Sequence, residues 1–190
     1  MRLNPTSKCL ISERDYLAYW VKNQLALVRD YRKKIYRKHD IPLYLVGGSS
    51  EDKYFPLVNR YVDGVSVLST CDPANPMAAS SWRTSRDIAE LCNRARIFVM
   101  PSKKESFCIA LIEAMACGTT CVVDGFYYGF DEKSLGPHVY GSITGSNGSI
   151  HDRIDEVLSR NIRIDASRWV KKYSLMATRK QLMAFIHKRL

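Results

Sequence analysis

The sequence has no run of apolar residues that approaches the roughly 20 needed to span a bilayer. Residues 1–8 also lack the apolar centre of a secretory signal peptide, and a strand-like run follows them directly. We therefore expect a protein that does not cross a membrane and does not enter an export pathway.

Cysteine patterns typical of metal sites are also missing. The six cysteines form no Cys-x-x-Cys pair and have no histidine at zinc-finger spacing, so we expect no metal site. Most of them lie in apolar segments, where reduced thiols behave as small hydrophobic side chains, which indicates a reducing, cytoplasmic compartment. The cysteines are Cys9, Cys71, Cys92, Cys108, Cys117 and Cys121.

A hydrolase motif is absent too. The four histidines have no serine or cysteine partner at recognisable spacing, and the chain contains no Gly-x-Ser-x-Gly sequence. We assign these histidines no catalytic role.

Acidic residues are scarce at both ends of the chain. Residues 1–40 and 151–190 each have ten Lys or Arg against four Asp or Glu, although the net charge of the whole chain is only +10. Basic ends can attract a phosphorylated ligand, anionic lipid or nucleic acid, and they also keep proteins soluble. The densest basic run, residues 29–38, lies in a segment with helical periodicity.

Short apolar runs alternate with segments of helical periodicity along the chain. Strands are expected at residues 8–11, 41–46, 65–68, 97–100, 120–123 and 139–143, and helices at 17–38, from 51, from 84, at 106–117, 150–159 and 174–190. This alternation predicts an α/β fold with a doubly wound parallel sheet. We expect one Rossmann-like domain over residues 1–190, with the helix at 174–190 as its cap and an irregular loop at 125–148.

Such sheets bind ligands in a crevice at the carboxyl ends of their strands, here in the loops after the second and fourth strands. The fourth strand is followed by Glu105 in a loop or at a helix start, and by Glu113 within the helix. Backbone N–H groups near Phe107, Cys108 and Ile109 have no partners inside the helix and can receive a diphosphate. Carboxylates accept hydrogen bonds from sugar hydroxyls. The sequence therefore predicts a site for a sugar nucleotide.

Residues 94–123 resemble the C-terminal domain of family-4 retaining glycosyltransferases of the GT-B fold. The family's pattern is an aliphatic strand, Pro-Ser, two residues, Glu, any residue, Phe-Gly, then Glu-Ala-Met-Ala, a small residue and Gly. This chain matches it except at the glycine after Phe. The resemblance implies that Glu113 holds the ribose hydroxyls of the donor and that Glu105 faces the transferred sugar and its departing phosphate as the catalytic residue. It also implies that Phe107, Cys108 and Ile109 supply backbone contacts. Cys108 replaces the family's glycine, a change expected to restrict how closely the backbone approaches the donor.

Three further segments bear on the resemblance. Arg14 and Lys22 resemble the family's basic pair that neutralises the diphosphate, at a longer spacing, and Gly47-Gly48 matches its glycine turn after the second strand. Residues 125–130 do not reproduce its Gly-Gly segment. The resemblance implies a UDP- or GDP-sugar donor, no cofactor and no metal.

GT-B enzymes have two Rossmann-like domains facing a cleft, and this chain has room for one. In a first hypothesis it is a glycosyltransferase that transfers a hexosyl group with retention, with acceptor groups from a partner chain, a second copy or an anionic membrane surface. In a second it is a non-catalytic nucleotide-sugar-binding module. In a third, which the resemblance does not favour, residues 29–38 bind nucleic acid on a Rossmann scaffold. The sequence identifies neither the sugar, the base nor the acceptor.

Overall fold

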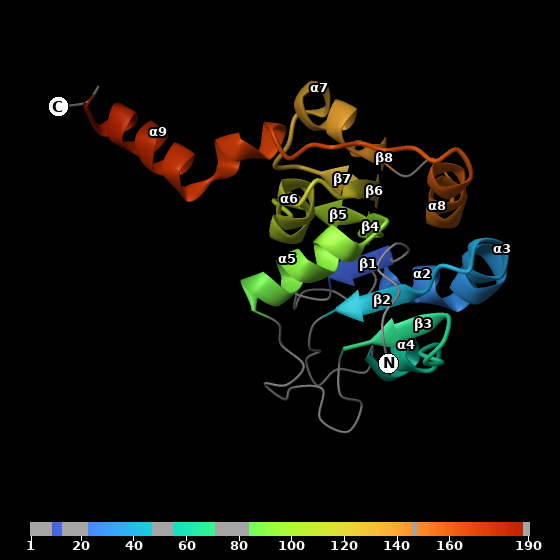
Figure 1. Ribbon diagram of the computed structural model, residues 1–190. Helices are drawn as coiled ribbons and strands as arrows, with labels where there is room; N and C mark the ends of the chain where they lie inside the picture. Colours follow the sequence, from blue (N-terminus) through green and yellow to red (C-terminus); the bar gives the residue numbers. More distant parts are fainter. Residues whose placement is uncertain (1–8, 13–22, 47–54, 71–83, 146–147, 188–190) are drawn as a thin grey trace.

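The computed structural model describes residues 9–12, 23–46, 55–70, 84–145 and 148–187 of the chain (Figure 1). Its main sheet has six parallel strands in the order β3-β2-β1-β4-β6-β8. These strands are β1 Cys9–Ser12, β2 Leu43–Val46, β3 Val67–Ser69, β4 Ile97–Met100, β6 Thr120–Asp124 and β8 Tyr140–Ser142. When these six strands are numbered in chain order, the sheet has the order 3-2-1-4-5-6 of the Rossmann fold. The predicted doubly wound α/β fold is confirmed.

Helices connect the strands. They are α2 Gln24–Tyr31, the π-helical η1 Arg32–Tyr36, α3 Arg37–His39, α4 Phe55–Asn59, α5 Ser85–Arg94, α6 Ile109–Ala116, α7 Glu132–Leu135, α8 Ile150–Ser159, α9 Leu175–His187, and the 3-10 helices η3 Gly136–His138 and η4 Trp169–Tyr173. In Figure 1, α9 extends away from the body of the molecule.

The sheet is covered on both faces because successive strand residues point to opposite sides. In β4, Ile97 and Val99 belong to a buried cluster with residues of α2, η1 and α8. Phe98 and Met100 belong to a second cluster with residues of α5 and α6. The strands β2, β4 and β6 are therefore buried along their whole length, as the apolar runs in their sequences predicted.

Several local predictions are confirmed. Thr84 begins α5 with a capping box, in which its hydroxyl accepts a hydrogen bond from the Asp87 N–H at 3.2 Å and the Asp87 carboxylate accepts one from the Thr84 N–H at 2.9 Å. The helix expected at 150–159 is α8. The helix expected at 17–38 is confirmed as α2, η1 and α3 from Gln24 onwards, whereas residues 17–22 and the helix start near 51 lie outside the described residues.

Two predictions were wrong in detail. The helix expected from residue 106 begins only at Ile109, because the chain between β4 and this helix first forms a short strand at Lys104–Glu105. The segment 125–148, expected to be a loop with one strand, also contains another short strand, α7 and η3. Short elements of this kind have too few residues to show a period in the sequence.

Asp63 organises the turn between α4 and β3. Its carboxylate accepts hydrogen bonds from the backbone N–H groups of Val65, Ser66 and Val67 at 2.9, 2.7 and 3.0 Å and from the Ser66 hydroxyl. Partial burial alone would raise the pKa of Asp63, but these hydrogen bonds outweigh it and lower the pKa to about 2.

A carboxyl group whose pKa is lowered by folding stabilises the protein above its unfolded pKa, and this contribution is lost as pH falls through the folded value. We therefore expect the free energy of unfolding in urea to fall between about pH 4 and pH 2, and to fall less steeply in Asp63→Asn. At pH 7 this variant should lose about 1 kcal/mol of stability. Asp131→Asn, at an exposed aspartate, is the control. A pH slope equal in wild type and Asp63→Asn would contradict this assignment.

Candidate functional site

The strand order locates the crevice of the sheet. From the neighbouring strands β1 and β4 the order runs in opposite directions, and ligands of open α/β sheets bind beyond the carboxyl ends of strands at such a point. The carboxyl ends of β1 and β4 therefore border the crevice. The sequence predicted the crevice at the loops after the second and fourth strands. The second strand, β2, is separated from β4 by β1, so it lies one strand away from the crevice.

Four predicted site residues lie outside the described residues. Arg14 and Lys22 lie between β1 and α2 in the sequence, and Gly47 and Gly48 follow β2. Their predicted contacts with the donor stay predictions.

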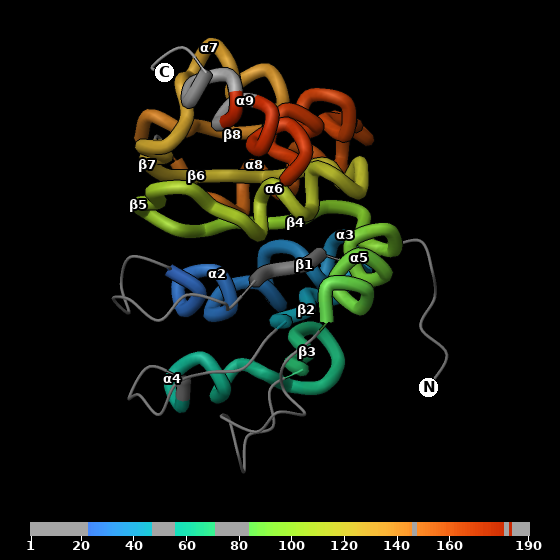
Figure 2. Tube along the Cα trace, turned by 90° about the vertical axis from the view of Figure 1, so that its left-hand side faces the viewer, coloured from blue at the N-terminus to red at the C-terminus, as the bar shows by residue number. Residues whose placement is uncertain are grey.

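The loop after β4 pairs with a segment that follows β6. Residues Lys104–Glu105 form β5, which is parallel to β7, Phe126–Tyr127. The N–H of Phe126 donates to the Lys103 carbonyl, and that of Tyr128 donates to the Glu105 carbonyl, both at 2.9 Å. Figure 2 shows β5 and β7 next to one another at one side of the molecule. The backbone that carries Glu105 is thus held by residues 126–128.

Two glycines allow this close approach. A Cβ atom on Gly125 would lie 2.0 Å from the Ser102 carbonyl oxygen, and one on Gly129 would lie 2.1 Å from that of Ser106. Any larger residue at either position would force the two segments apart. Sequence reasoning missed this role, although the spacing of glycines around Phe-Tyr-Tyr was a visible signal.

Glu105 itself is buried, with 7% of its surface exposed, directly across from Tyr127. The Tyr127 hydroxyl donates to the Met100 carbonyl at 3.4 Å, at the end of β4. Burial, and after it the electrostatic effects of Cys108 and Glu105, raise the pKa of Tyr127 far above its usual range, so it stays a neutral donor. The Glu105 carboxylate therefore lies on the inner side of the small sheet, near the end of β4.

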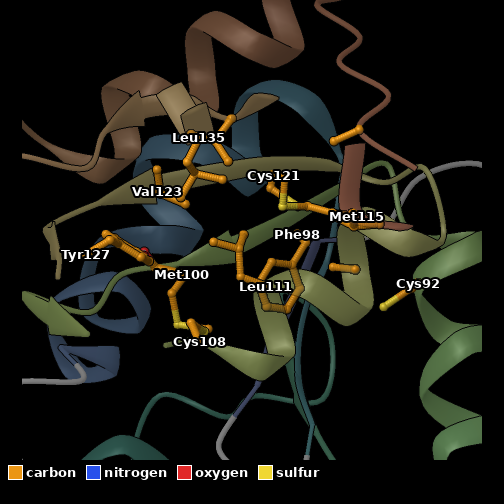
Figure 3. Close-up of a cluster of buried hydrophobic side chains, with 14 of the residues drawn as sticks. Cys92, Phe98, Met100, Cys108, Leu111, Met115, Cys121, Val123, Tyr127 and Leu135 are labelled. Atoms are coloured by element: carbon orange, nitrogen blue, oxygen red, sulfur yellow. The ribbon is translucent and has the colours of Figure 1, made fainter. Parts of the chain in front are cut away.

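Cys108 immediately precedes α6 as its N-cap residue. Its φ of −79° and ψ of 97° suit any residue, so the backbone does not require the glycine found in the family pattern. Its side chain is 2% exposed and belongs to the cluster that contains Met100 and Leu111 (Figure 3). The thiol is directed into the core.

Glu113 lies in the second turn of α6, whose buried residues are Leu111, Ala114 and Met115. It is half-buried. Burial, followed by the Cys117 thiol and the Glu113 carboxylate, raises the pKa of Cys92, a residue of α5, to about 12. Glu113 is thus close to α5, which covers the part of the sheet nearer β1 and β2 because Cys92 clusters with residues of β2.

Phe107 and Ile109 present their side chains to solvent while their backbone starts the helix. Phe107 stacks on Phe130 with ring centroids 5.0 Å apart and meets Tyr173 edge-on at 5.5 Å. The first N–H groups of α6 have no acceptor within the helix, and the positive end of its dipole lies at the carboxyl edge of the sheet. An anion in the crevice could accept hydrogen bonds from them.

The basic side chains of α2, η1 and α3 are exposed. Three of them contact acidic groups: Arg32 lies 3.6 Å from Asp63, Lys34 lies 3.9 Å from Asp30, and Lys38 donates to Asp155 at 2.7 Å. A helix that follows a parallel strand runs back along that strand. The basic residues come late in this helical segment, so they lie toward the amino edge of the sheet, away from the carboxyl edge near which Glu105 lies.

Within the described residues, no group of three or more His, Cys, Asp and Glu side chains is arranged to hold a metal ion. The same part of the chain has no helix that is both long and apolar enough to cross a membrane.

The sequence family described as glycosyl transferases group 1 matches residues 79–174, just over half of the chain. The chain belongs to this family. The matched region extends past α5, β4, α6 and β6 into η4, and so includes both Glu105 and Glu113. A search of curated proteins finds no match.

Solved structures share the fold of this glycosyl transferases group 1 chain at low sequence identity. Alr3699/HepE of Anabaena, solved in complex with UDP and glucose, has a TM-score of 0.70 and 15% identity over 98% of this chain and 49% of its own. Sucrose-phosphate synthase of Thermosynechococcus elongatus has a TM-score of 0.66 and 19% identity, over 99% of this chain and 47% of its own. The UDP-forming α,α-trehalose-phosphate synthase of Burkholderia vietnamiensis has a TM-score of 0.67 and 9% identity, over 97% of this chain and 46% of its own. The chain spans about half the length of these structures.

The contact between Gly129 and Ser106 can be tested by adding one methyl group. Gly129→Ala should lower the free energy of unfolding by about 1–3 kcal/mol, because the two backbones must separate. Gly136→Ala is the matched control, since a Cβ there would meet only the Glu132 Cγ at an ordinary 3.6 Å. Urea unfolding measures both. Equal stability of the two variants would show that residues 125–129 do not constrain the loop.

The position of the Cys108 thiol leads to a second expectation. Cys108→Gly should destabilise the protein by about 1–3 kcal/mol, because a buried side chain is lost and the backbone before α6 gains freedom. Thermal and urea unfolding measure this effect. A variant that is as stable as wild type would show that the thiol does not contribute to the core.

Proposed function

We propose that this chain is the donor-binding, C-terminal half of a family-4 retaining glycosyltransferase of the GT-B fold, and that its donor is a UDP- or GDP-hexose. The observation that carries the proposal is the arrangement around the start of α6 at the carboxyl edge of the sheet. Glu105 is buried shortly before the helix, Glu113 lies half-buried in its second turn, and the first N–H groups of the helix have no acceptor within it. Membership of the glycosyl transferases group 1 family supports it.

Each part of a sugar nucleotide has a counterpart in this arrangement. The diphosphate accepts hydrogen bonds from the N–H groups of the first turn of α6, at residues 109–111. Glu113 accepts hydrogen bonds from the two ribose hydroxyls, as an acidic residue does in dinucleotide-binding folds. Glu105, held by β7, meets the hydroxyls of the hexose. Arg14 and Lys22 are proposed to neutralise the diphosphate from the loop after β1.

In the proposed reaction, the bond between the anomeric carbon and the diphosphate oxygen breaks, and negative charge develops on that departing oxygen. The acceptor oxygen forms the new bond to the anomeric carbon on the same face, and its proton passes to the departing diphosphate oxygen. The chain contributes by orienting the hexose through Glu105 and by stabilising that charge through the α6 N–H groups and the two basic residues. No metal or cofactor is assigned to this step.

The acceptor side is proposed to come from outside the described domain: from a further domain, a partner chain, a second copy or an anionic membrane surface bound by the basic residues 29–38. The alternative is a module that binds nucleotide sugars without transferring them. Donor hydrolysis separates the two, because a transferase domain in water releases free sugar slowly, whereas a pure binding module returns the donor intact. No observation on the structure favours a nucleic-acid function.

The donor assignment is tested by thermal shift. UDP, UDP-glucose, GDP and GDP-mannose are added singly, and at about 100 times its dissociation constant the bound ligand should add about 2.7 kcal/mol, or roughly 5–10 °C. Glu113→Gln should lose most of the shift with every ligand that carries a ribose. Glu105→Gln should keep the shift with UDP and lose the additional shift with UDP-glucose.

Glu90→Gln, at an exposed carboxylate of α5, is the matched control and should behave as wild type. An unchanged shift in Glu113→Gln would remove the ribose assignment. No shift of the wild-type protein with any of the four nucleotides would remove the proposed function.

A further inference from the structure

The thiols of Cys92 and Cys117 meet between two helices that cover the same face of the sheet. Cys92 lies near the end of α5, and Cys117 directly follows the last residue of α6. The two side chains are hydrogen-bonded to each other. Because β4, β5 and all of α6 separate them in the sequence, this contact depends on the packing of α5 beside α6.

The backbone holds the two residues near one another. After Cys117, α6 ends at Gly118, whose φ of +71° belongs to the left-handed region that terminates helices. The Thr119 hydroxyl then donates to the Cys92 carbonyl at 2.9 Å. The segment that leaves α6 is therefore attached to α5 beside the two thiols.

The two thiols differ in exposure. Cys92 is buried and directed from α5 into the core cluster, whereas Cys117 is partly exposed (Figure 3). Burial raises the pKa of Cys117, but its hydrogen bond with Cys92 acts in the opposite direction. The same hydrogen bond raises the pKa of Cys92, which therefore acts as the donor. A thiolate at Cys117 is thus both accessible to a reagent in solvent and stabilised by its neighbour.

The other cysteines with described side chains do not combine these properties. Cys108 and Cys121 are buried, and the Cys121 thiol donates to the Thr119 carbonyl at 3.3 Å. Buried thiols of this kind are inert while the protein stays folded. The pair of an accessible thiol and a buried thiol in contact with it belongs to Cys117 and Cys92 alone among these four.

We propose that Cys92 and Cys117 are a redox-active dithiol, which a peroxide converts into a disulfide between α5 and α6. The Cys117 thiolate attacks one peroxide oxygen, which gives a sulfenic acid and a hydroxide that takes up the proton lost by Cys117. The Cys92 sulfur then attacks the sulfenic sulfur, and the sulfenic oxygen leaves as water with the Cys92 proton. The two sulfurs together lose two electrons, and the peroxide is reduced to two waters.

Glu113 lies close to this dithiol. It precedes Cys117 by one helical turn on α6, and its charge acts on both thiols. The disulfide would therefore hold the part of α6 that carries Glu113 to α5. No step of the oxidation uses a nucleotide, so the dithiol goes beyond the proposed function and does not rest on it.

The test is peptide mapping of the folded wild-type protein after treatment with hydrogen peroxide. Trypsin leaves Cys92 in the peptide 87–94 and Cys117 in the peptide 105–133, so the disulfide joins these peptides with the loss of two hydrogens. Fragmentation should locate the bond at Cys117, and dithiothreitol should separate the peptides. Because the bond closes a loop of the unfolded chain, it should raise the Tm by about 5–10 °C.

Two variants accompany the wild type. Cys117→Ser should give no cross-link from Cys92 and no rise in Tm with peroxide. Cys121→Ala, the matched control, removes a neighbouring buried thiol and should still form the bond. Thermal unfolding before treatment shows that both variants are folded. In wild type without peroxide, iodoacetamide should label Cys117 and spare Cys92, a measurement that needs no variant.

Several results would overturn the dithiol. One is oxidation of Cys117 to a sulfinic acid while Cys92 stays reduced, because the second thiol would then fail to reach the first. Others are a bond from Cys117 to Cys121, a cross-link of Cys92 to 105–133 that persists in Cys117→Ser, and no reaction of either thiol. A Tm that falls when the Cys92–Cys117 bond forms would also overturn it, since the bond would then require the two helices to move out of their native packing.

Discussion

The chain leaves β4, turns and starts α6 within eight residues, and those residues follow the backbone of 125–129 so closely that Gly125 and Gly129 have no room for a side chain. This contact determines where Glu105 lies, since the Lys103 and Glu105 carbonyls accept hydrogen bonds from the N–H groups of Phe126 and Tyr128. It also determines which side chains of β7 are buried. Tyr127 is directed to the end of β4, and its two neighbours are directed to solvent. The buried carboxylate and the outer aromatic pair thus depend on one backbone contact.

The sequence predicted the elements that carry a long enough period. The strands of the main sheet, α5 with its Thr84 cap, and α8 follow from apolar runs, a capping box and helical spacing. The Rossmann order of the sheet was not predictable from spacing, because local periodicity does not record which strands are neighbours. That order puts the crevice at the carboxyl ends of β1 and β4, one strand away from the position expected at β2.

The candidate site was predictable in part. The pattern around Glu105 and Glu113 predicts a loop followed by a helix, and the structure has the segment after β4 and α6 there. The burial of Glu105 and the inward position of the Cys108 thiol depend on contacts with residues far along the chain, so they were not predictable. Residues 125–130 lack the glycine pair of the family pattern. Their own glycines, four residues apart, serve a different purpose: they permit contact between two backbones, and the aromatic residues between them gain fixed directions.

The four cysteines with described side chains all belong to one side of the sheet. Cys92, Cys108 and Cys121 are buried in the cluster beneath α5 and α6, Cys117 packs against it, and the described side chains of the opposite cluster include none. A thiol reagent can reach Cys92, Cys108 and Cys121 only when that layer opens, since the layer covers them, whereas Cys117 is partly exposed. The three buried thiols are therefore natural reporters of local unfolding in the half of the core that supports α6.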